Sequence, residues 1–297
     1  MTSKHWTAAD LPDMTGRTVI VTGASSGLGA ATTQHLARAG ARVVLAVRNV
    51  AKGEDIARSA GGRSEVRHLD LAELASVRAF ARAWTGSVDI LINNAGVMML
   101  PKGRTADGFE LQIGTNHFGH FALTNLLLPH ITDRVVTVSS HLHTGGRIDI
   151  EDLNWEQRRY DPDRAYADSK QANLLFTLEL QRLLEAARSD VRAVSAHPGI
   201  ASTNLGAHLG GFRGMVAEIA VRFVAQDAEH GALPTLYAAT QDIPGNTYVG
   251  PDGLGHIRGA PMVMAPSKAS QDRALAQRLW ARSATLTGVL TPVLTAA

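Results

Sequence analysis

A tyrosine and a lysine stand four residues apart in the sequence YADSK, residues 166–170. In a helix this spacing places the Tyr166 phenol and the Lys170 ammonium on one face. An isolated tyrosine has a pKa of about 10, and a neighbouring cation lowers that pKa by stabilising the phenolate. The pair therefore predicts acid–base chemistry near neutral pH, with Tyr166 as proton donor or acceptor. Many helices contain this spacing by chance, so the pair alone is a weak signal.

Two further segments carry polar groups suited to a reacting centre. Ser139 and Ser140 close an apolar, β-rich run, where a hydroxyl could hydrogen-bond a substrate oxygen as charge develops on it. Asn116 lies in a helical pattern between Gly114 and Gly119, which is locally unfavourable for a helix. This placement indicates a site, although close helix packing would also explain the glycines.

A glycine-rich segment, TGASSGLG at residues 22–29, stands between a β-rich run and a helical pattern. Glycines there let the backbone turn tightly and approach a pyrophosphate, while the helix N-terminus supplies N–H donors. The spacing is Gly-x-x-x-Gly-x-Gly rather than the broader Gly-x-Gly-x-x-Gly fingerprint. A turn without a ligand is the alternative, but the flanking strand and helix favour a dinucleotide site. The expected contacts are Gly23, Ser25, Ser26, Gly27, Leu28 and Gly29.

The end of the next β-rich run predicts which dinucleotide binds. A free ribose 2′-OH calls for an acid there, whereas a 2′-phosphate calls for an arginine. Val47 occupies the position of the acid and Arg48 follows it. A solvated surface arginine is the alternative, but the missing acid favours NADP(H). Asp70 and Leu71 end the third run, where they could contact the adenine edge.

Two asparagines follow the fourth run, in the sequence NNAG. Asn93 and Asn94 would cost desolvation energy after a buried strand unless they were hydrogen-bonded. They are expected to form part of the turn, and Asn94, Ala95 and Gly96 are expected to contact the cofactor.

Strands and helices must alternate to position these residues, and the sequence shows that alternation. We expect strands at Arg17–Thr22, Arg42–Ala46, Glu65–Leu69, Asp89–Ile92, Arg134–Ser139 and Val191–Ala196. Helical periodicity covers Gly29–Ala39, Lys52–Ala60, Leu74–Trp84, Ala106–Leu128 and Tyr166–Ala187. This order predicts an α/β fold, a doubly wound, Rossmann-like parallel sheet with helices on both faces. Ligands of such sheets bind beyond the carboxyl ends of the strands.

The C-terminal part is expected to complete a single domain over residues 1–297. The segment 204–224 breaks the alternation and is glycine-rich, then apolar, which suits a flap over a sizeable, largely apolar substrate. An amphipathic helix packed on the sheet is the alternative. Leu205 and Phe212 are the flap residues expected to contact substrate. A glycine- and proline-rich loop precedes a short strand at Pro261–Met264, and a closing helix covers Ala269–Thr285.

Composition excludes several classes of protein. The 297 residues include 45% apolar and 19% charged residues and a net charge of +2, which is typical of a soluble globular protein. Lys and Arg are scattered, so we expect no nucleic-acid partner. No apolar stretch is long enough to cross a bilayer, and no membrane association is expected. There is no cysteine, which excludes disulfides and thiolate sites and favours the cytoplasm.

Taken together, these motifs resemble the short-chain dehydrogenase/reductase family. TGASSGLG, NNAG, the serine pair, YADSK and HPG (197–199) occur in that family's order and at its usual spacing, over about residues 16–203. The resemblance implies a hydride transfer between a nicotinamide and a carbonyl or alcohol carbon, with Tyr166 as the acid/base. A reductase of a carbon–carbon double bond uses similar residues, and a non-catalytic NADP-sensing regulatory protein is a further alternative.

The resemblance also implies roles for individual residues. Ser140, preferred over Ser139, would steady the substrate oxygen, and Lys170 would bind the nicotinamide ribose and lower the tyrosine pKa. Asn116 would hold a water in a proton relay. His141 is expected to line the substrate pocket with Ser140 and Tyr166. The nicotinamide side would be lined by Pro198, Gly199, Ile200 and Thr203.

The segment between Ser140 and Tyr166 is longer than is usual in the family and carries RIDIEDLNWE. With AYADSKQANLLFTLEL it is similar to the retinol-dehydrogenase-like branch, many of whose members prefer NADP. Two departures stand out: the N-terminal membrane anchor common in that branch is not expected here, and Asp168 replaces a usually small residue.

Twelve histidines raise the possibility of a metal site, but the pair His117/His120 has no third ligand, so no metal is expected. The expected partner is a small-molecule carbonyl or alcohol. The sequence is compatible with a homodimer or a homotetramer and does not distinguish them from a monomer.

Overall fold

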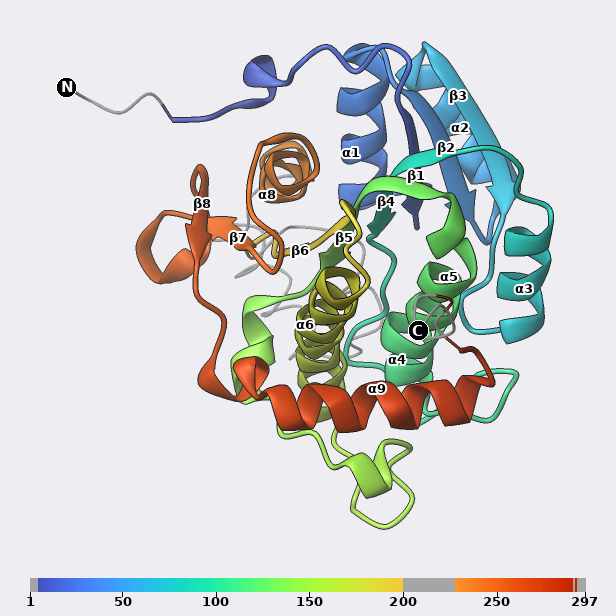
Figure 1. Ribbon diagram of the computed structural model, residues 1–297, viewed down its shortest axis with the longest axis vertical. Coiled ribbons are helices and arrows are strands. Elements are labelled where there is room, and N and C mark those ends of the chain that lie inside the picture. Colours follow the sequence, from blue (N-terminus) through green and yellow to red (C-terminus); the bar gives the residue numbers. More distant parts are fainter. Residues whose placement is uncertain (1–4, 200–227, 291, 293–297) are drawn as a thin grey trace, which may run out of the picture.

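The computed structural model describes residues 5–199, 228–290 and 292. The strands among these residues are β1 (Thr18–Thr22), β2 (Arg42–Val47), β3 (Arg63–His68), β4 (Val88–Asn93), β5 (Ile131–Val138), β6 (Arg192–Ala196), β7 (Tyr248–Pro251) and β8 (Pro261–Met264). They form one sheet in the order β3-β2-β1-β4-β5-β6-β7-β8 (Figure 1). The first seven strands are parallel, and β8 pairs antiparallel with β7.

Helices cover both faces of the sheet, as the alternation predicts. They are α1 (Gly27–Arg38), α2 (Val50–Ala60), α3 (Leu74–Arg82), α4 (Leu111–Ile113), α5 (Gly119–Leu127), α6 (Pro162–Ala186), α8 (Ala228–Thr240) and α9 (Arg273–Thr287). A π-helical turn, η2 (Gly114–Phe118), joins α4 to α5. Helices α1, α2 and α8 pack on one face, and α3, α5, α6 and α9 pack on the other.

The central strands contribute side chains to two separate hydrophobic cores, because successive side chains of a strand point to opposite faces of the sheet. In β1, Val19 and Val21 belong to the core beneath α1, whereas Ile20 belongs to the core beneath α5 and α6. All three are completely buried. The continuous apolar runs of the sequence are therefore the runs of a sheet covered on both sides, and the predicted doubly wound fold is confirmed.

The strand order reverses between β1 and β4. From β1 the chain moves outward through β2 and β3, then returns to place β4 on the other side of β1. The loops after β1 and β4 therefore diverge and leave a crevice at the carboxyl edge, which is the usual ligand site of this architecture. The glycine-rich segment and the Asn94–Gly96 turn both lie there.

Several helix starts differ from the sequence prediction, and two of them bear on the residues near the crevice. The helix expected from Ala106 begins at Leu111, because the Glu110 carboxylate caps it by accepting hydrogen bonds from the backbone of Gln112 and Ile113. Helix α6 begins at Pro162 rather than at Tyr166, since Asp161 supplies the N-cap. Tyr166 therefore lies in the second turn of α6 and not at its start.

The C-terminal part holds one strand and one helix that the sequence did not indicate. Strand β8 matches the prediction, and α9 covers most of the expected closing helix. Strand β7 lies inside the stretch that was expected to be a glycine- and proline-rich loop, and this expectation was wrong. Pairing with β6 and β8 outweighs the poor strand propensity of Gly250 and Pro251. Helix α8 contains an internal proline, Pro234.

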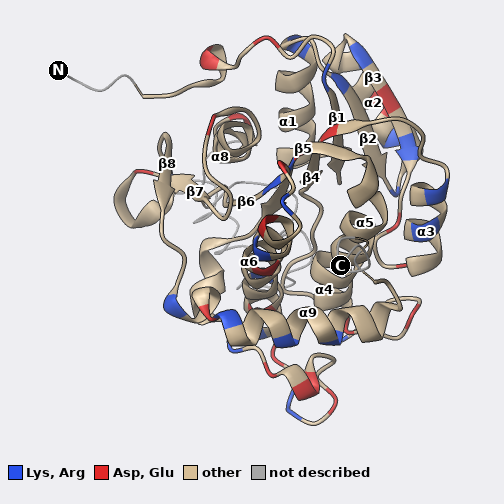
Figure 2. Cartoon of the chain, in the orientation of Figure 1, with Lys and Arg blue, Asp and Glu red and all other residues tan. Residues whose placement is uncertain are grey.

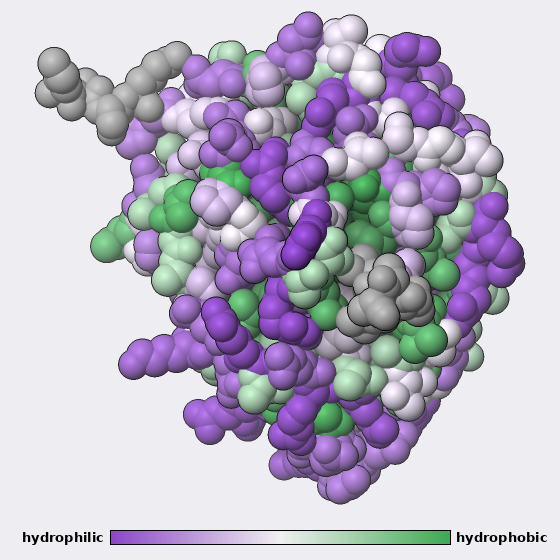
Figure 3. Space-filling model, in the orientation of Figure 1, coloured by the Kyte–Doolittle hydropathy of each residue, from purple (hydrophilic) through white to green (hydrophobic). Residues whose placement is uncertain are grey.

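The surface in view is mixed in character. Basic and acidic residues are interspersed along the outer helices and loops (Figure 2). Polar residues cover most of this face, and apolar atoms gather where β8 lies (Figure 3), in line with the exposed side chains of Met262 and Val263. Among the residues that the structure describes, no helix has the length and apolar character needed to cross a membrane.

Glycines 114 and 119, which flank Asn116, are packing residues. A Cβ on Gly119 would overlap the Leu71 carbonyl oxygen and lie 2.9 Å from the Leu71 Cβ. A Cβ on Gly114 would overlap the Thr105 side chain. Close packing, the alternative explanation of these glycines, therefore accounts for both of them.

We predict that Gly119→Ala lowers the free energy of unfolding by about 1–3 kcal/mol, because the methyl group meets a backbone carbonyl that cannot rotate away. The better helix propensity of alanine offsets only part of this loss. Urea denaturation of the purified proteins measures the effect. Gly145→Ala is the matched control, since its Cβ would meet only the Ala167 Cβ, at 3.9 Å. Equal stability of the two variants would contradict the prediction.

Candidate active site

The glycine-rich loop after β1 has a shape that only glycine permits. Gly23 and Gly27 have φ values of 66° and 52°, in the left-handed region. A Cβ on Gly23 would lie 2.8 Å from the Ala95 Cα, and one on Gly29 would lie 2.6 Å from the Asn94 Nδ2. The backbone is therefore packed closely against the turn after β4, and the N-terminus of α1 is left at the carboxyl edge. Ser26, the N-cap residue of α1, makes no side-chain capping bond. Ser25 and Leu28 are half-buried in the same loop.

A buried chain of hydrogen bonds links this loop to the helix that carries Asn116. The Thr22 hydroxyl accepts from the backbone N–H groups of Asn94 and Ala95, at 2.9 and 3.0 Å, and contacts His120 Nε2 at 2.9 Å. His120 Nδ1 lies 2.9 Å from the Asn116 carbonyl oxygen and must donate to it. Nε2 is then the acceptor, and the Thr22 hydroxyl donates to it. Burial lowers the pKa of His120 to about 4, in keeping with this neutral ring.

The asparagines after β4 have the structural roles that the sequence suggested. Asn93 is buried and donates from its side chain to the Thr124 hydroxyl at 2.8 Å. The Asn94 side chain donates to the Thr22 carbonyl at 2.8 Å and so ties β4 to the end of β1. Gly96 follows within the crevice.

Arg48 stands at the carboxyl end of β2. Val47, at the position where an acid would read a free ribose, is buried with 1% of its surface exposed, and its methyl group fills the space above Gly53. Arg48 is exposed, and its guanidinium makes no hydrogen bond or ion pair with any residue that the structure describes. An arginine available in this way fits a phosphate ligand.

Asp70 and Leu71 lie after β3 at the same edge. The Asp70 carboxylate accepts from the backbone N–H of Ala72 at 2.9 Å and forms a turn. The Leu71 side chain packs in the hydrophobic core, so only its main chain is placed to contact a ligand.

Four polar side chains converge beside the crevice: those of Asn116, Ser140, Tyr166 and Lys170. Ser140 hydrogen-bonds the Tyr166 phenol through its side chain. Lys170 Nζ lies 5.8 Å from the centre of the Tyr166 ring. A Cβ on Gly96 would lie 3.3 Å from both Lys170 Nζ and Asn116 Oδ1. The loops after β4 and β5, the turn η2 and the helix α6 thus meet at one place.

The two neighbouring serines have different partners. The Ser139 hydroxyl is buried and donates to the Lys170 carbonyl oxygen at 2.8 Å, which joins β5 to α6. Ser140 instead faces Tyr166, and its hydroxyl also accepts from the Leu142 N–H at 3.2 Å. The structure therefore places Ser140, and not Ser139, beside the phenol.

Burial shifts the pKa values of the tyrosine and the lysine in opposite directions. Burial raises the pKa of Tyr166 to about 12, and the Ser140 hydrogen bond counteracts part of this rise. Burial lowers the pKa of Lys170 to about 8. In the protein without cofactor the net shift of the tyrosine pKa is therefore upward, because desolvation of the phenolate dominates, and the expectation that Lys170 lowers this pKa together with a positive nicotinamide stays a prediction. Lys170 Nζ donates instead to the Val138 carbonyl oxygen at 3.1 Å.

The Asn116 side chain is fully engaged. Its Oδ1 accepts from the Val97 N–H at 2.8 Å, and its Nδ2 donates to the Val97 carbonyl and to the Ser169 hydroxyl, both at 2.9 Å. It lies in the π-helical turn η2, and such turns are frequent at functional sites. The side chain thus fixes the strand-end loop, and the expected role of Asn116 in holding a water stays a prediction.

Asp168 anchors the long segment before α6 rather than changing the charge of the site. It is buried and accepts from the Arg147 N–H at 2.7 Å and from the Arg158 guanidinium at 3.2 Å. Arg158 stacks on the Trp155 ring at 3.7 Å.

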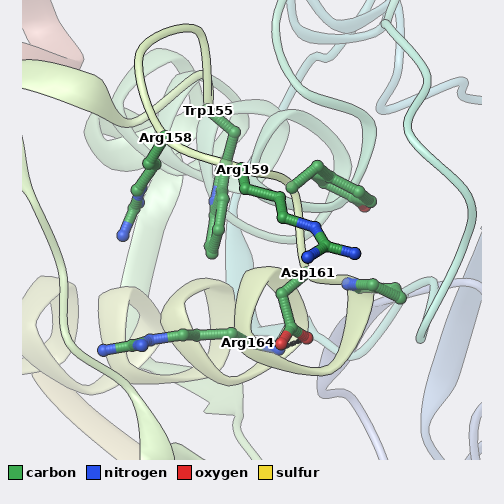
Figure 4. Close-up of a pocket in the computed structure, with 7 residues that line it drawn as sticks. Trp155, Arg158, Arg159, Asp161 and Arg164 are labelled. Atoms are coloured by element: carbon green, nitrogen blue, oxygen red, sulfur yellow. Dashed lines mark hydrogen bonds between the residues drawn. The ribbon is translucent and has the colours of Figure 1, made fainter.

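The segment before α6 also borders a surface cavity of about 640 Å³ (Figure 4). None of the four converging side chains, those of Asn116, Ser140, Tyr166 and Lys170, lines this cavity.

Some expected site residues lie outside the described part of the chain. These are Ile200, Thr203, Leu205, Phe212 and the whole segment 204–224. Pro198 and Gly199 are described directly after β6, where Gly199 adopts a φ of 71° and donates to His197 Nδ1 at 3.2 Å. His141 is half-buried, and its ring faces those of His197 and His256.

The other buried histidines have structural partners. His117, buried beside α9, contacts the Ser283 hydroxyl at 2.8 Å, and burial lowers the pKa of His117 to about 3. Within residues 5–199, 228–290 and 292, no group of three or more His, Cys, Asp or Glu side chains could hold a metal ion.

Several known proteins are similar to this chain in sequence. The short chain dehydrogenase family matches residues 17–214. The chain is 41% identical over 297 residues to retinol dehydrogenase 13 of Homo sapiens, covering 93% of this chain and 86% of that protein. It is 40% identical over 298 residues to polyprenol dehydrogenase of Mus musculus, covering 94% and 86%.

A solved structure also aligns over almost the whole chain. A putative uncharacterized protein from Mycobacterium Paratuberculosis is 53% identical, with a TM-score of 0.86 over 97% of this chain and 100% of that one. The chain belongs to the short-chain dehydrogenase/reductase family of oxidoreductases, which act on alcohol and carbonyl groups, and within it to the part that resembles retinol dehydrogenases.

Proposed function

We propose that the protein is an NADP-dependent oxidoreductase that interconverts the alcohol and carbonyl forms of a sizeable, largely apolar substrate. The convergence of Ser140, Tyr166 and Lys170 beside the crevice at the reversal of strand order carries this proposal. Such a cluster provides a proton and a hydrogen-bond donor at the edge where a dinucleotide binds.

The residues present fit a dinucleotide. Glycines 23 and 27, at φ values that would strain a residue with a side chain, keep the loop free of side chains, and the first turn of α1 contains no acid. The N-terminal N–H groups of α1 therefore suit a pyrophosphate. When bound, NADP(H) would supply or accept the hydride, and its oxidised form would add a positive charge to the site.

Side chains of this protein transfer the proton and stabilise the substrate oxygen. With a pKa of about 12, Tyr166 is protonated at neutral pH and can donate to a carbonyl oxygen as that oxygen gains charge. Ser140 is placed to donate a hydrogen bond to the same oxygen. Lys170 contributes a positive charge nearby and is placed to bind a ribose hydroxyl.

NADP is preferred over NAD because of Arg48. Its exposed guanidinium stands where a 2′-phosphate is read, and the buried Val47 leaves no carboxylate for a ribose 2′-OH. The apolar substrate is supported by the relatives, whose names specify retinol and polyprenol, both long apolar alcohols. NADPH oxidation with all-trans-retinal, decanal and pyruvate tests the proposal, which requires turnover of at least one of the first two and a preference for them over pyruvate.

Tyr166→Phe is expected to lower kcat by about 10²–10⁴-fold while folding and NADPH binding stay near normal, because the ring is kept and only the acid hydroxyl is lost. Steady-state kinetics and NADPH titration measure this. The matched control is Tyr160→Phe, which removes a hydroxyl that bonds Glu110 and Leu100 away from the cluster. Retention of more than about a tenth of wild-type kcat by Tyr166→Phe would rule out this acid–base role.

Arg48→Ala is expected to weaken NADPH binding far more than NADH binding, because a charge-assisted, often bidentate contact to the 2′-phosphate is lost. Fluorescence titration with each cofactor gives the two dissociation constants. Arg38→Ala removes the same charge from the exposed last turn of α1 and serves as the control. An equal loss for both cofactors would show that Arg48 does not read the phosphate.

The pH dependence should show the titration of Lys170. Its pKa of about 8 means that the ammonium is charged below this pH and neutral above it. We therefore expect kcat/KM for carbonyl reduction to fall as the pH rises through about 8, with NADPH kept saturating. A kcat/KM that stays level up to pH values near the usual lysine pKa, about 10.4, would contradict a need for this charge.

A further inference from the structure

His143 lies directly behind Ser140, in the 3₁₀ turn η4 (His141–Gly145) that Ser140 caps. Its side chain is buried, with 3% of the residue exposed. Ring atom Nδ1 lies 2.7 Å from the Ser140 carbonyl oxygen, and ring atom Nε2 lies 3.1 Å from the backbone N of Ser267, after β8. The ring thus bridges the loop after β5 and the segment between β8 and α9.

Two of the three polar partners of the ring determine where its proton lies, because the third, the Tyr248 hydroxyl 3.5 Å from Nδ1, can either donate or accept. A carbonyl oxygen can only accept, so Nδ1 must carry the proton and donate to Ser140. The Ser267 N–H can only donate, so Nε2 must be bare and accept from it. Burial lowers the pKa of His143; the hydrogen bond to the Ser140 carbonyl raises it in part and the neighbouring His141 lowers it, so the net shift favours the neutral ring. His143 is therefore held as the neutral Nδ1–H tautomer.

The surroundings leave the ring in one position. The Tyr248 ring meets it edge-on, with centroids 5.6 Å apart and an interplanar angle of 88°. Ser267 is itself fixed by a contact of 2.9 Å between its hydroxyl and that of Ser270. The backbone N–H of His143 also donates to the Ser140 carbonyl, at 3.1 Å. Two donors from one residue therefore hold the Ser140 main chain.

This bracing matters for the neighbouring hydroxyl. The Ser140 hydroxyl has to point at Tyr166 and at a substrate oxygen, and its position follows from its main chain, which is extended at φ −149° and ψ 153°. Small displacements of a group that contacts the reacting atoms cost large factors in rate. No hydrogen bond, ion pair or ring contact joins His143 to Tyr166 or Lys170, so its link to the cluster runs through Ser140.

We propose that His143 is a positioning residue, which holds Ser140 through its Nδ1–H and is itself aligned by the Ser267 N–H. The assignment rests on the proposed function, since it assumes that Ser140 contacts the substrate oxygen. It also makes the C-terminal segment after β8 a support of the catalytic serine, although the two lie more than a hundred residues apart in the sequence.

Two substitutions separate the two hydrogen bonds. In His143→Asn the amide nitrogen takes the place of Nδ1 and keeps the donor to Ser140. In His143→Gln the amide oxygen takes the place of Nε2 and keeps only the acceptor for Ser267. Both remove the ring, so both should lower the melting temperature to a similar extent.

The two variants should differ in turnover. His143→Asn should keep kcat for all-trans-retinal within about threefold of wild type, and His143→Gln should lower kcat by about tenfold to a hundredfold. The NADPH dissociation constant should not change in either variant.

Equal kcat losses in the two variants, or none in either, would overturn the proposal, because a merely structural histidine would not distinguish donor from acceptor. Two-bond ¹H–¹⁵N correlation spectra of the wild-type protein provide a readout that needs no turnover, with the His143 signals identified by their loss in His143→Asn. A neutral Nδ1–H ring at pH 7 supports the proposal, and an Nε2–H ring or a cation overturns it. If the wild-type protein reduces neither all-trans-retinal nor decanal, the proposed function fails, and the spectra still decide the state of His143.

Discussion

The arrangement of the loops at the carboxyl edge of the sheet depends on the Thr22 hydroxyl. It accepts from the backbone of the turn after β4 and donates to His120, which in turn donates to the Asn116 carbonyl. One side chain thereby joins the end of β1, the end of β4 and the π-helical turn η2. Because Thr22, His120 and Asn116 are buried, each bond lost between them would leave a polar group without a partner in a region that water does not reach. The crevice is thus set by hydrogen bonding as well as by glycine geometry.

The same burial sets the chemistry of the site. Removing water from around Tyr166 and Lys170 disfavours the phenolate and the ammonium alike, so one pKa rises to about 12 and the other falls to about 8. Both groups are therefore closer to their neutral forms than they would be in solution. A phenol that resists ionisation suits donation to a carbonyl, while the reverse reaction needs extra positive charge nearby.

Sequence reasoning was most successful where local pattern and global fold agree. The apolar runs predicted the parallel strands, and the motif order predicted which side chains meet at the carboxyl edge. It failed where tertiary contacts decide the outcome. Strand β7 forms inside a glycine- and proline-rich stretch because two strands flank it. His120 was weighed as a possible metal ligand, and its hydrogen bond to Thr22, like that of His143 to Ser267, left no trace in local spacing. The direction of the Tyr166 pKa shift depends on burial, which spacing does not report.

Asp168 shows how a single position can decide which loop a fold accepts. Its carboxylate is buried and faces the Arg147 N–H and the Arg158 guanidinium. A small residue there would leave the arginine without this counter-ion and the loop without its anchor. The acid and the extended loop before α6 therefore form one unit. Transfer of the loop to a relative with a shorter segment would require Asp168 as well. Shortening of the loop in this protein would leave a buried carboxylate without its partners, next to the turn of α6 that carries Tyr166 and Lys170.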